Sequence, residues 1–265
     1  MRKLEYRNAI PVAAHRGVAK YYPENTMASF KAAVALRPDM IETDVHITSD
    51  GQLVLCHDHK LDRTTDGHGL IRETTLADVK KADAGAWKDE KFRGERVPLL
   101  EELLDLVKDD KDIMLNIELK DYPKDCGDLA YVSAEKTLNM LDEYKVLDRC
   151  VINSFSGELL EKLDEEYGDS ILIHAYHPQE QMGLNQKRFV YDYAYCVCLF
   201  GMGDDPVVPK WVFDTVKSYG VEPWVYYSTD TPDVYERAIK NGAMLFTSND
   251  PGWAMFYLRS KGLHE

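Results

Sequence analysis

The sequence predicts an α/β fold, a closed (β/α)₈ barrel, and three observations carry this prediction. Short runs rich in Val, Ile and Leu alternate with segments of helical periodicity, which is the pattern of repeated β-α units around a parallel sheet. Eight such runs fit into 265 residues, a length typical of one barrel. No linker or low-complexity tract interrupts them, so one barrel domain over residues 1–265 is expected.

The predicted elements follow in order along the chain. Apolar runs predict strands at residues 12–17, 40–47, 113–120, 150–155, 171–176, 193–200, 222–228 and 243–248. Apolar residues at helical spacing predict helices at residues 26–36, 99–107, 131–144, 157–167, 209–219 and 232–240. Barrel active sites lie at the carboxyl ends of the strands, so polar residues at those ends are the first candidates for a functional site.

A hairpin and a long connection interrupt the β-α series. Residues 52–57 are strand-like and follow the turn signal Ser49-Asp50-Gly51, which predicts an antiparallel hairpin. A turn centred near Asp50 and Gly51 would place His57 opposite Asp44, at the carboxyl end of the second strand. Residues 59–97 are polar, contain glycine and lack clear periodicity, and we expect a small inserted cap or lid over the barrel mouth.

The composition excludes several classes of partner. Lys plus Arg number 32 and Asp plus Glu 46, a net charge of −14, which repels the phosphate backbone of a nucleic acid. No window reaches the roughly 18 to 20 apolar residues of a transmembrane segment. Residues 1–10 lack the apolar stretch of a secretory signal, so a cytoplasmic location is expected. The sequence carries no signal for an oligomeric state.

Acidic side chains alternate with apolar ones on two predicted strands. Glu42 and Asp44 share one face of the second strand, and Glu118 and Lys120 share one face of the strand at 113–120. A single acid would indicate only a solvated strand end, but two such pairs favour a cation, because neighbouring carboxylates repel and hard divalent ions prefer oxygen ligands. We predict one divalent cation, Mg²⁺ or Ca²⁺ with Mn²⁺ also compatible, bound by Glu42, Asp44 and Glu118, with Lys120 as a positive charge for an anion.

The end of the first strand adds groups for acid-base chemistry. It reads His15-Arg16-Gly17, where the imidazole can transfer a proton and the guanidinium can bind a tetrahedral anion through its fork of donors. The hairpin is expected to bring His57 to the same end of the barrel. Two histidines beside a metal site are typical of phosphoryl chemistry, because one ring removes a proton while the other protonates a leaving group.

Longer motifs connect these residues to a known family. They read HRG at 15–17, PENT at 23–26 with SF at 29–30, IETDV at 41–45, TSDG at 48–51, HD at 57–58, LDRTT at 61–65, VPL at 97–99 and IELK at 117–120. With these motifs the chain resembles the glycerophosphodiester phosphodiesterases. The resemblance is dense over residues 12–120, and downstream it is carried by INSF at 152–155, Trp224 and residues 247–251.

The resemblance implies a TIM-type barrel that hydrolyses glycerophosphodiesters to glycerol 3-phosphate and an alcohol. The substrate's own glycerol hydroxyl attacks phosphorus in such enzymes, and water then opens the cyclic phosphate. The roles implied for this chain are general acid and base for His15 and His57, phosphate or substrate contact for Arg16, Lys120 and Trp224, and metal binding for Glu42, Asp44 and Glu118.

Two segments depart from the family pattern. Residues 224–227 read WVYY where the family usually has WTVN, which bears on the fit of the glycerol or the alcohol. Residues 248–251 read SNDP where the family has Thr-Asp before an aromatic residue and proline. His46, His59 and His68 lie outside the motifs and are expected at the surface or in the lid.

Two other functions stay open. A lysophospholipase D-type enzyme would use the same chemistry on lysophospholipids, although no apolar docking segment is evident in the sequence. A non-catalytic phosphodiester-binding barrel would keep the pocket without turnover, although the presence of both His15 and His57 disfavours it. In each case the expected ligand is a small phosphodiester.

Overall fold

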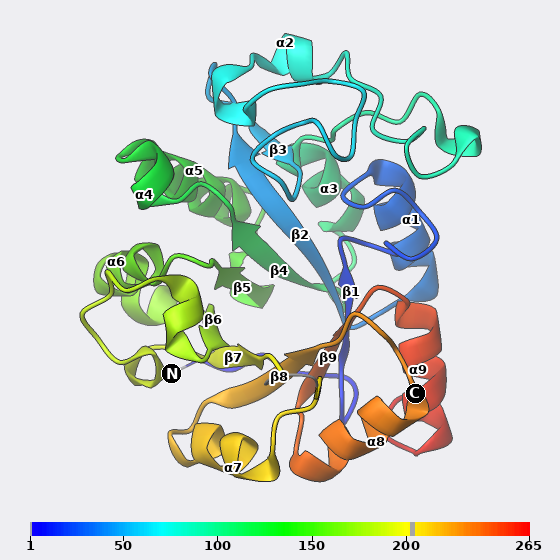
Figure 1. The fold of residues 1–265 in the computed structure, drawn as a ribbon, viewed down its shortest axis with the longest axis vertical. Helices are drawn as coiled ribbons and strands as arrows, with labels where there is room; N and C mark the ends of the chain where they lie inside the picture. Colours follow the sequence, from blue (N-terminus) through cyan, green and yellow to red (C-terminus); the bar gives the residue numbers. More distant parts are fainter. Residues whose placement is uncertain (1, 202–204) are drawn as a thin grey trace.

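The computed structural model describes residues 2–201 and 205–265, and within these residues nine strands form one sheet (Figure 1). The strands are β1 (Val12–His15), β2 (Met40–Ile47), β3 (Leu53–Leu55), β4 (Met114–Leu119), β5 (Cys150–Asn153), β6 (Ile173–His177), β7 (Cys196–Leu199), β8 (Glu222–Tyr226) and β9 (Leu245–Ser248). All except β3 run parallel, and β1 pairs with both β2 and β9, which closes the barrel. The predicted (β/α)₈ barrel is confirmed.

The longer helices pack around the outside of the barrel, and the short α2 lies in the 59–97 excursion (Figure 1). The α-helices of the described residues are α1 (Met27–Leu36), α2 (Leu76–Val79), α3 (Leu100–Val107), α4 (Pro123–Cys126), α5 (Leu129–Glu143), α6 (Gly157–Tyr167), α7 (Lys210–Ser218), α8 (Pro232–Asn241) and α9 (Pro251–Ser260). The six helices predicted from periodicity are α1, α3, α5, α6, α7 and α8. Between β6 and β7 the described residues contain two short 3₁₀ helices in place of an α-helix, η5 (Gln179–Met182) and η6 (Val190–Asp192).

The last helix, α9, was not predicted, although its start signal is present in the sequence. The Asp250 carboxylate caps the helix by accepting a hydrogen bond from the Trp253 amide at 3.1 Å, and Pro251 occupies the first helical position. An acidic cap followed by proline is a typical helix start, so the segment that departs from the family pattern begins this helix.

The hairpin after β2 is confirmed, but its predicted register was wrong by one residue. Val45 pairs with Leu55, and the Cys56 amide donates to the Asp44 carbonyl, so Cys56 rather than His57 lies opposite Asp44. The reason is a three-residue loop that ends in Gly51 with a positive φ of 78°, where we had expected a two-residue turn. His57 therefore lies beyond the end of β3, where its side chain turns toward the barrel mouth.

The excursion, residues 59–97, lies beside β2 and β3 at one edge of the barrel mouth (Figure 1). It contains η1 (Ile71–Glu73), α2 and η2 (Glu90–Phe92), and a small apolar cluster of its own that includes Leu61, Ile71 and Val79. A buried cluster of this kind gives the segment a defined shape in spite of its polar sequence. Its action as a lid, and the assignment of the whole chain to one domain, stay predictions.

A membrane-crossing helix is not found among the described residues, since none of their helices combines the necessary length and apolarity.

Candidate active site

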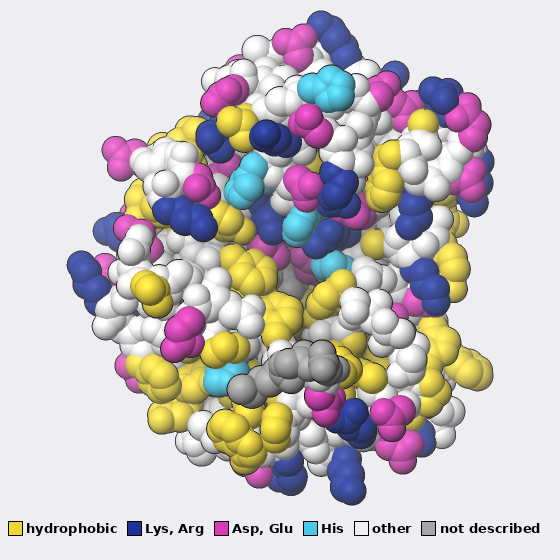
Figure 2. Space-filling view, viewed as in Figure 1, with side chains coloured by type: hydrophobic (Ala, Val, Ile, Leu, Met, Phe, Trp, Pro, Cys, Tyr) yellow, Lys and Arg dark blue, Asp and Glu magenta, His cyan; other side chains and the backbone are white. Residues whose placement is uncertain are grey.

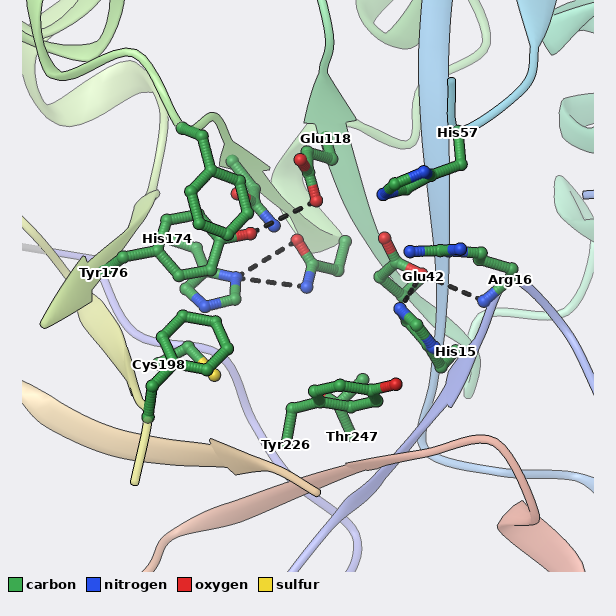
Figure 3. Close-up of a pocket in the computed structure, with 14 residues that line it drawn as sticks. His15, Arg16, Glu42, His57, Glu118, His174, Tyr176, Cys198, Tyr226 and Thr247 are labelled. Carbon is green, nitrogen blue, oxygen red and sulfur yellow. Dashed lines mark hydrogen bonds and ion pairs between the residues drawn. The ribbon is translucent and has the colours of Figure 1, made fainter. Parts of the chain in front are cut away.

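The carboxyl ends of the strands surround a pocket of about 150 Å³ (Figure 3). Residues that line it come from most of the barrel: His15, Arg16, Glu42, His57, Asn116, Glu118, Asn153, Phe155, His174, Tyr176, Cys198, Phe200, Tyr226 and Thr247. Charged and histidine side chains border the mouth on the side of the excursion, and hydrophobic side chains border it on the other side (Figure 2). We call this cavity the catalytic pocket.

Three buried carboxylates meet at the floor of the catalytic pocket. In the register of β2 and β4, Glu42 pairs with Asn116 and Asp44 pairs with Glu118, so alternation along both strands places the acids side by side. One oxygen each of Glu42, Asp44 and Glu118 lies within 4.8 Å of the others. The structure therefore brings together the three predicted metal ligands.

The surroundings of these carboxylates fit a divalent cation. Burial and the charge of Asp44 raise the pKa of Glu42 well above its ordinary range. Burial alone would raise the pKa of Asp44 too, but Arg16 and Lys120 lower it below its ordinary value. The Oδ1 atom of Asp44 is fully buried and has no hydrogen-bond partner among the described residues. A buried carboxylate oxygen that accepts no hydrogen bond and has only the Lys120 ammonium near it, 3.5 Å away, lies here beside two more carboxylates. Together they offer the oxygen ligands that Mg²⁺, Ca²⁺ or Mn²⁺ would take.

Arg16 and Lys120 lie directly on this acidic cluster. The Nε atom of Arg16 is 3.2 Å from Asp44, and its backbone amide donates to Glu42 at 2.9 Å. Lys120 donates to Glu118 at 2.7 Å and lies 3.5 Å from Asp44. Although burial opposes its charge, Glu118 and Asp44 raise the pKa of Lys120. Two cations do not balance three carboxylates, whereas a divalent ion would turn the cluster positive, as a phosphate ligand requires.

The His15-Arg16-Gly17 turn has a local cause. Arg16 adopts a left-handed backbone with φ of 53°, and Gly17 follows with φ of 84°. A Cβ atom on Gly17 would lie 2.4 Å from the Ser29 hydroxyl, so only glycine fits where the chain passes α1. The turn directs the Arg16 amide and guanidinium toward the carboxylates.

His15 is held in one orientation by the end of β9. Its Nδ1 atom lies 2.6 Å from the amide oxygen of Asn249, and its ring lies 4.5 Å from the ring of Tyr226. Since an amide oxygen only accepts, Nδ1 carries the proton and Nε2 is left as an acceptor, 3.9 Å from Glu42. Burial, with the charge of Arg16, lowers the pKa of His15 to about 3. The ring is therefore neutral and able to accept a proton through Nε2.

His57 has a different partner. Its Nδ1 atom contacts the Asp58 carboxylate at 2.6 Å, and Arg63 of the excursion grips that carboxylate with two hydrogen bonds at 2.8 and 2.9 Å. Arg63 also donates to Glu24, which in turn accepts from Arg16 at 2.8 Å. One chain of charged groups thus connects the two histidine motifs. His57 and His15 lie on opposite sides of the Arg16 and Glu42 side chains (Figure 3).

The opposite wall of the catalytic pocket is aromatic, and sequence reasoning missed it. Phe155 stacks on Tyr176 with ring centroids 3.7 Å apart, and the Phe200 ring lies beside both, 5.5 Å from Tyr176 and 6.1 Å from Phe155. The Tyr176 hydroxyl donates to Glu118 at 3.1 Å, which links this wall to the carboxylates. Each of these residues lies on or just after a strand, at the end where barrel sites occur, and that position was the available signal.

Trp224, for which the resemblance implied contact with substrate, does not line the catalytic pocket. Its side chain is fully buried below the catalytic pocket, where it contacts the His174 ring at 4.9 Å and donates to Glu222 at 3.0 Å. Tyr226, two residues later on the same face of the strand, lines the pocket instead. Trp224 belongs to the packed interior layer of the barrel, and Tyr226 occupies the place expected for it.

His46 is a second correction. It was expected at the surface or in the lid, but it is buried and its Nδ1 atom pairs with Asp121 at 2.9 Å. Asp121 also accepts from the Ile47 amide and the Ser133 hydroxyl, so the pair joins β2 to α5. His68 is exposed, as expected.

Five of the eight predicted site residues thus line one cavity at the carboxyl end of a parallel barrel, and Asp44 and Lys120 contact them in the carboxylate cluster. Buried carboxylates suited to a metal, two imidazoles with different partners and two cations define a barrel enzyme that acts on phosphoric diesters.

Comparisons with known proteins name the group within this class. Residues 15–251 match the Glycerophosphoryl diester phosphodiesterase family, and the chain belongs to that family. The glycerophosphodiester phosphodiesterase of Caldanaerobacter subterraneus subsp. tengcongensis is 36% identical over 259 residues, which are 95% of this chain and 98% of that protein. The chain is accordingly an enzyme, a phosphoric diester hydrolase of the glycerophosphodiester phosphodiesterase type.

Solved structures support the same fold. A phosphodiesterase of Oleispira antarctica, solved in complex with the product sn-glycerol-3-phosphate, superposes with a TM-score of 0.79 at 23% identity, covering 94% of this chain and 96% of that one. A glycerophosphodiester phosphodiesterase from Agrobacterium tumefaciens superposes with a TM-score of 0.74 at 22% identity, covering 92% and 97%. At these identities the likeness is evidence for the barrel fold alone.

Proposed function

We propose that the enzyme hydrolyses glycerophosphodiesters to glycerol 3-phosphate and an alcohol, with one divalent cation bound by Glu42, Asp44 and Glu118. The observation that carries the proposal is that these three carboxylates form one buried cluster, and that two of them line the same pocket as the imidazoles of His15 and His57. When bound, the cation supplies positive charge that stabilises the negative charge developing on the phosphate oxygens.

Arg16 and Lys120 position the phosphate. Both reach the carboxylate cluster from opposite neighbours of β2, and both are held there by ion pairs. A guanidinium binds a phosphate through two parallel donors, whereas an ammonium acts as a point charge. The two groups therefore orient the diester so that its glycerol hydroxyl can reach phosphorus.

The hydrogen-bond partners of the histidines suggest their roles. Asn249 keeps the proton of His15 on Nδ1, so His15 Nε2 takes the proton of the attacking glycerol hydroxyl as the new P–O bond forms. Asp58 stabilises a positive ring at His57, which gives its proton to the departing alcohol oxygen as the old P–O bond breaks. In the second step water opens the cyclic phosphate. His57 accepts a proton from the attacking water, and His15 returns its proton to the glycerol oxygen that leaves phosphorus.

The test is release of glycerol 3-phosphate from glycerophosphoglycerol and glycerophosphocholine, in chelator and after addition of Mg²⁺, Ca²⁺ or Mn²⁺. Product that disappears in chelator and returns with one of the ions supports the proposal. Release that survives exhaustive chelation would overturn the metal role. Turnover of lysophosphatidylcholine alone would identify a lysophospholipase D-type enzyme, and tight binding without product would identify a binding barrel.

A further inference from the structure

A second cavity adjoins the catalytic pocket and shares three of its lining residues, His15, Arg16 and Tyr226. It has a volume of about 500 Å³ against about 150 Å³ for the catalytic pocket. Apart from Ala19, the rest of its lining is polar: Lys20, Glu24, Lys88, Ser228, Thr229, Asp230 and Asn249. We call this cavity the polar chamber.

The two cavities differ in size, and each suits a different half of a glycerophosphodiester. Every such substrate shares the glycerol phosphate half, which suits the smaller catalytic pocket beside the carboxylates and the stacked rings of Phe155 and Tyr176. The alcohol half varies between substrates and needs the larger space. The polar chamber opens from His15 and Arg16, so it is placed to receive the leaving alcohol while phosphorus lies at the carboxylates.

The charges of the polar chamber are unevenly paired. Its carboxylates are engaged, because Glu24 accepts from Arg16 and Arg63, and Asp230 accepts from Tyr235 and Ser248. Lys20 is paired with Asp250 at 2.9 Å.

The half-buried Lys88 ammonium instead donates to the Ala19 carbonyl at 2.8 Å, and no acidic side chain of residues 2–201 and 205–265 pairs with it. In a chain with a net charge of −14, this is a cation available to a ligand.

The loop that presents Lys88 is firmly built. The Asp83 carboxylate accepts hydrogen bonds from the Gly85, Ala86 and Gly94 amides at 2.6 to 2.9 Å, and the Ala84 amide donates to the Glu95 carbonyl. These bonds close the loop on itself. The Lys88 contact to Ala19 then fixes it to the connection between β1 and α1, directly beside Arg16. A rigid support is what a recognition residue requires.

We propose that the polar chamber binds a leaving alcohol that is a polyol carrying a second negative charge, such as a phosphorylated glycerol, and that Lys88 is its specificity-determining residue. This inference rests on the proposed function. Ser228, Thr229 and Asn249 supply hydroxyl and amide groups for a polyol, and Lys88 supplies the charge for its phosphate. A quaternary ammonium headgroup is disfavoured, because among the residues that the structure describes Tyr226 is the one aromatic side chain lining the chamber, and the Lys88 ammonium has no acidic partner.

The test compares kcat and KM for three substrates: glycerophosphoglycerol with a terminal phosphate, glycerophosphoglycerol and glycerophosphocholine. We expect Lys88→Gln to raise KM for the phosphorylated substrate about tenfold, since a charge-assisted contact is lost, and to leave kcat within about twofold. Values for glycerophosphoglycerol should stay within about twofold, which also verifies folding of the variant. Lys88→Arg should restore the low KM.

A matched control is Lys81→Gln, which removes an exposed lysine from the same excursion. It should leave the three substrates unaffected. Equal losses on all three substrates with Lys88→Gln, or no change on the phosphorylated one, would overturn the role of Lys88 while the wild-type enzyme still releases glycerol 3-phosphate. No release from any substrate by the wild-type enzyme would instead overturn the proposed function and the inference with it.

Discussion

The two ends of the barrel treat a buried acid in opposite ways. At the amino end Asp39, just before β2, accepts from Asn8 at 2.6 Å and from the Val12 amide at 2.9 Å, and contacts His264 at 2.9 Å. Burial opposes the charge, but the hydrogen bonds from His264 and Val12 lower the pKa of Asp39. Glu42, three residues later at the carboxyl end, has its pKa raised by burial and by Asp44.

The difference between these two acids separates a residue that stabilises the fold from one that is placed for function. Asp39 has enough donors to be stable as an anion, and it ties the first strand to the C-terminal residues. Glu42 accepts a hydrogen bond from the Arg16 amide, but it lies beside two more buried carboxylates, and its pKa is raised. A buried acid whose surroundings do not satisfy it is held for something that binds there, which fits the division of barrels into a stabilising and a catalytic face.

Glu42→Gln should give the largest loss of activity of the variants considered. The kcat/KM for release of glycerol 3-phosphate should fall by about 10³-fold, because a bound divalent ion contributes several kcal/mol of transition-state stabilisation. In chelator the same change should raise the melting temperature, because it removes one of three crowded buried charges.

The pH dependence of that gain follows from the direction of the pKa shift. A carboxyl whose pKa is raised on folding contributes stability below its ordinary pKa near 4.5 and loses it as the pH rises through the folded value. Melting in chelator should therefore favour Glu42→Gln more at about pH 8 than at about pH 5. Glu135→Gln, on the exposed face of α5, is the control. Retained activity of Glu42→Gln, or a lower melting temperature of this variant in chelator, would contradict the assignment of Glu42 as a metal ligand.

Asp39→Asn should have the opposite effect on stability to Glu42→Gln. The free energy of unfolding should fall by about 3 kcal/mol at neutral pH, because one partner of a buried hydrogen-bonded pair is removed. A carboxyl with a lowered pKa contributes stability above its ordinary value near 3.8 and loses it as the pH falls through the folded value, so the cost should shrink in acid. Denaturant titrations at neutral and acidic pH measure this. A large loss of kcat in the folded variant would contradict the purely stabilising role of Asp39.

Arg63→Lys examines the carboxyl end at a distance from the metal site. The guanidinium holds Asp58 with two bonds and Glu24 with two more, and an ammonium cannot reproduce that fork. We expect kcat to fall about tenfold if His57 has the proposed role, because Asp58, which orients its ring, loses the fork that holds it. Arg93→Lys is the control, since Arg93 grips Glu90 in the same way on the exposed side of the excursion. Equal kcat for the two variants would show that Asp58 needs no such support.

Most of the barrel, and the grouping of the candidate site residues at its carboxyl end, could be predicted from the sequence, because alternation along β2 and β4 is a local property. Alternation places Trp224 and Tyr226 on the same face of β8, but it does not say how deep each lies in the barrel. Depth depends on how neighbouring strands are staggered, and that is a tertiary property. The Asn249 contact to His15 joins residues at opposite ends of the chain, so no local pattern could indicate it.

Tyr226→Phe should give the smallest decrease in kcat of these variants, because the Tyr226 hydroxyl acts on His15 only through Asn249. The hydroxyl accepts from the Asn249 amide at 3.2 Å, and Asn249 in turn orients His15. Loss of one such hydrogen bond is expected to cost about 1 kcal/mol, or about a fivefold decrease in kcat, while the ring contact with His15 remains. Steady-state kinetics on glycerophosphoglycerol measures the change. Tyr227→Phe, on the opposite face of the strand end, should leave kcat unaltered. A lower kcat for Tyr227→Phe would contradict the distinction between residues that line the pocket and residues that only pack at this strand end. The orientation of His15 would then depend on the whole end of β8 rather than on Asn249.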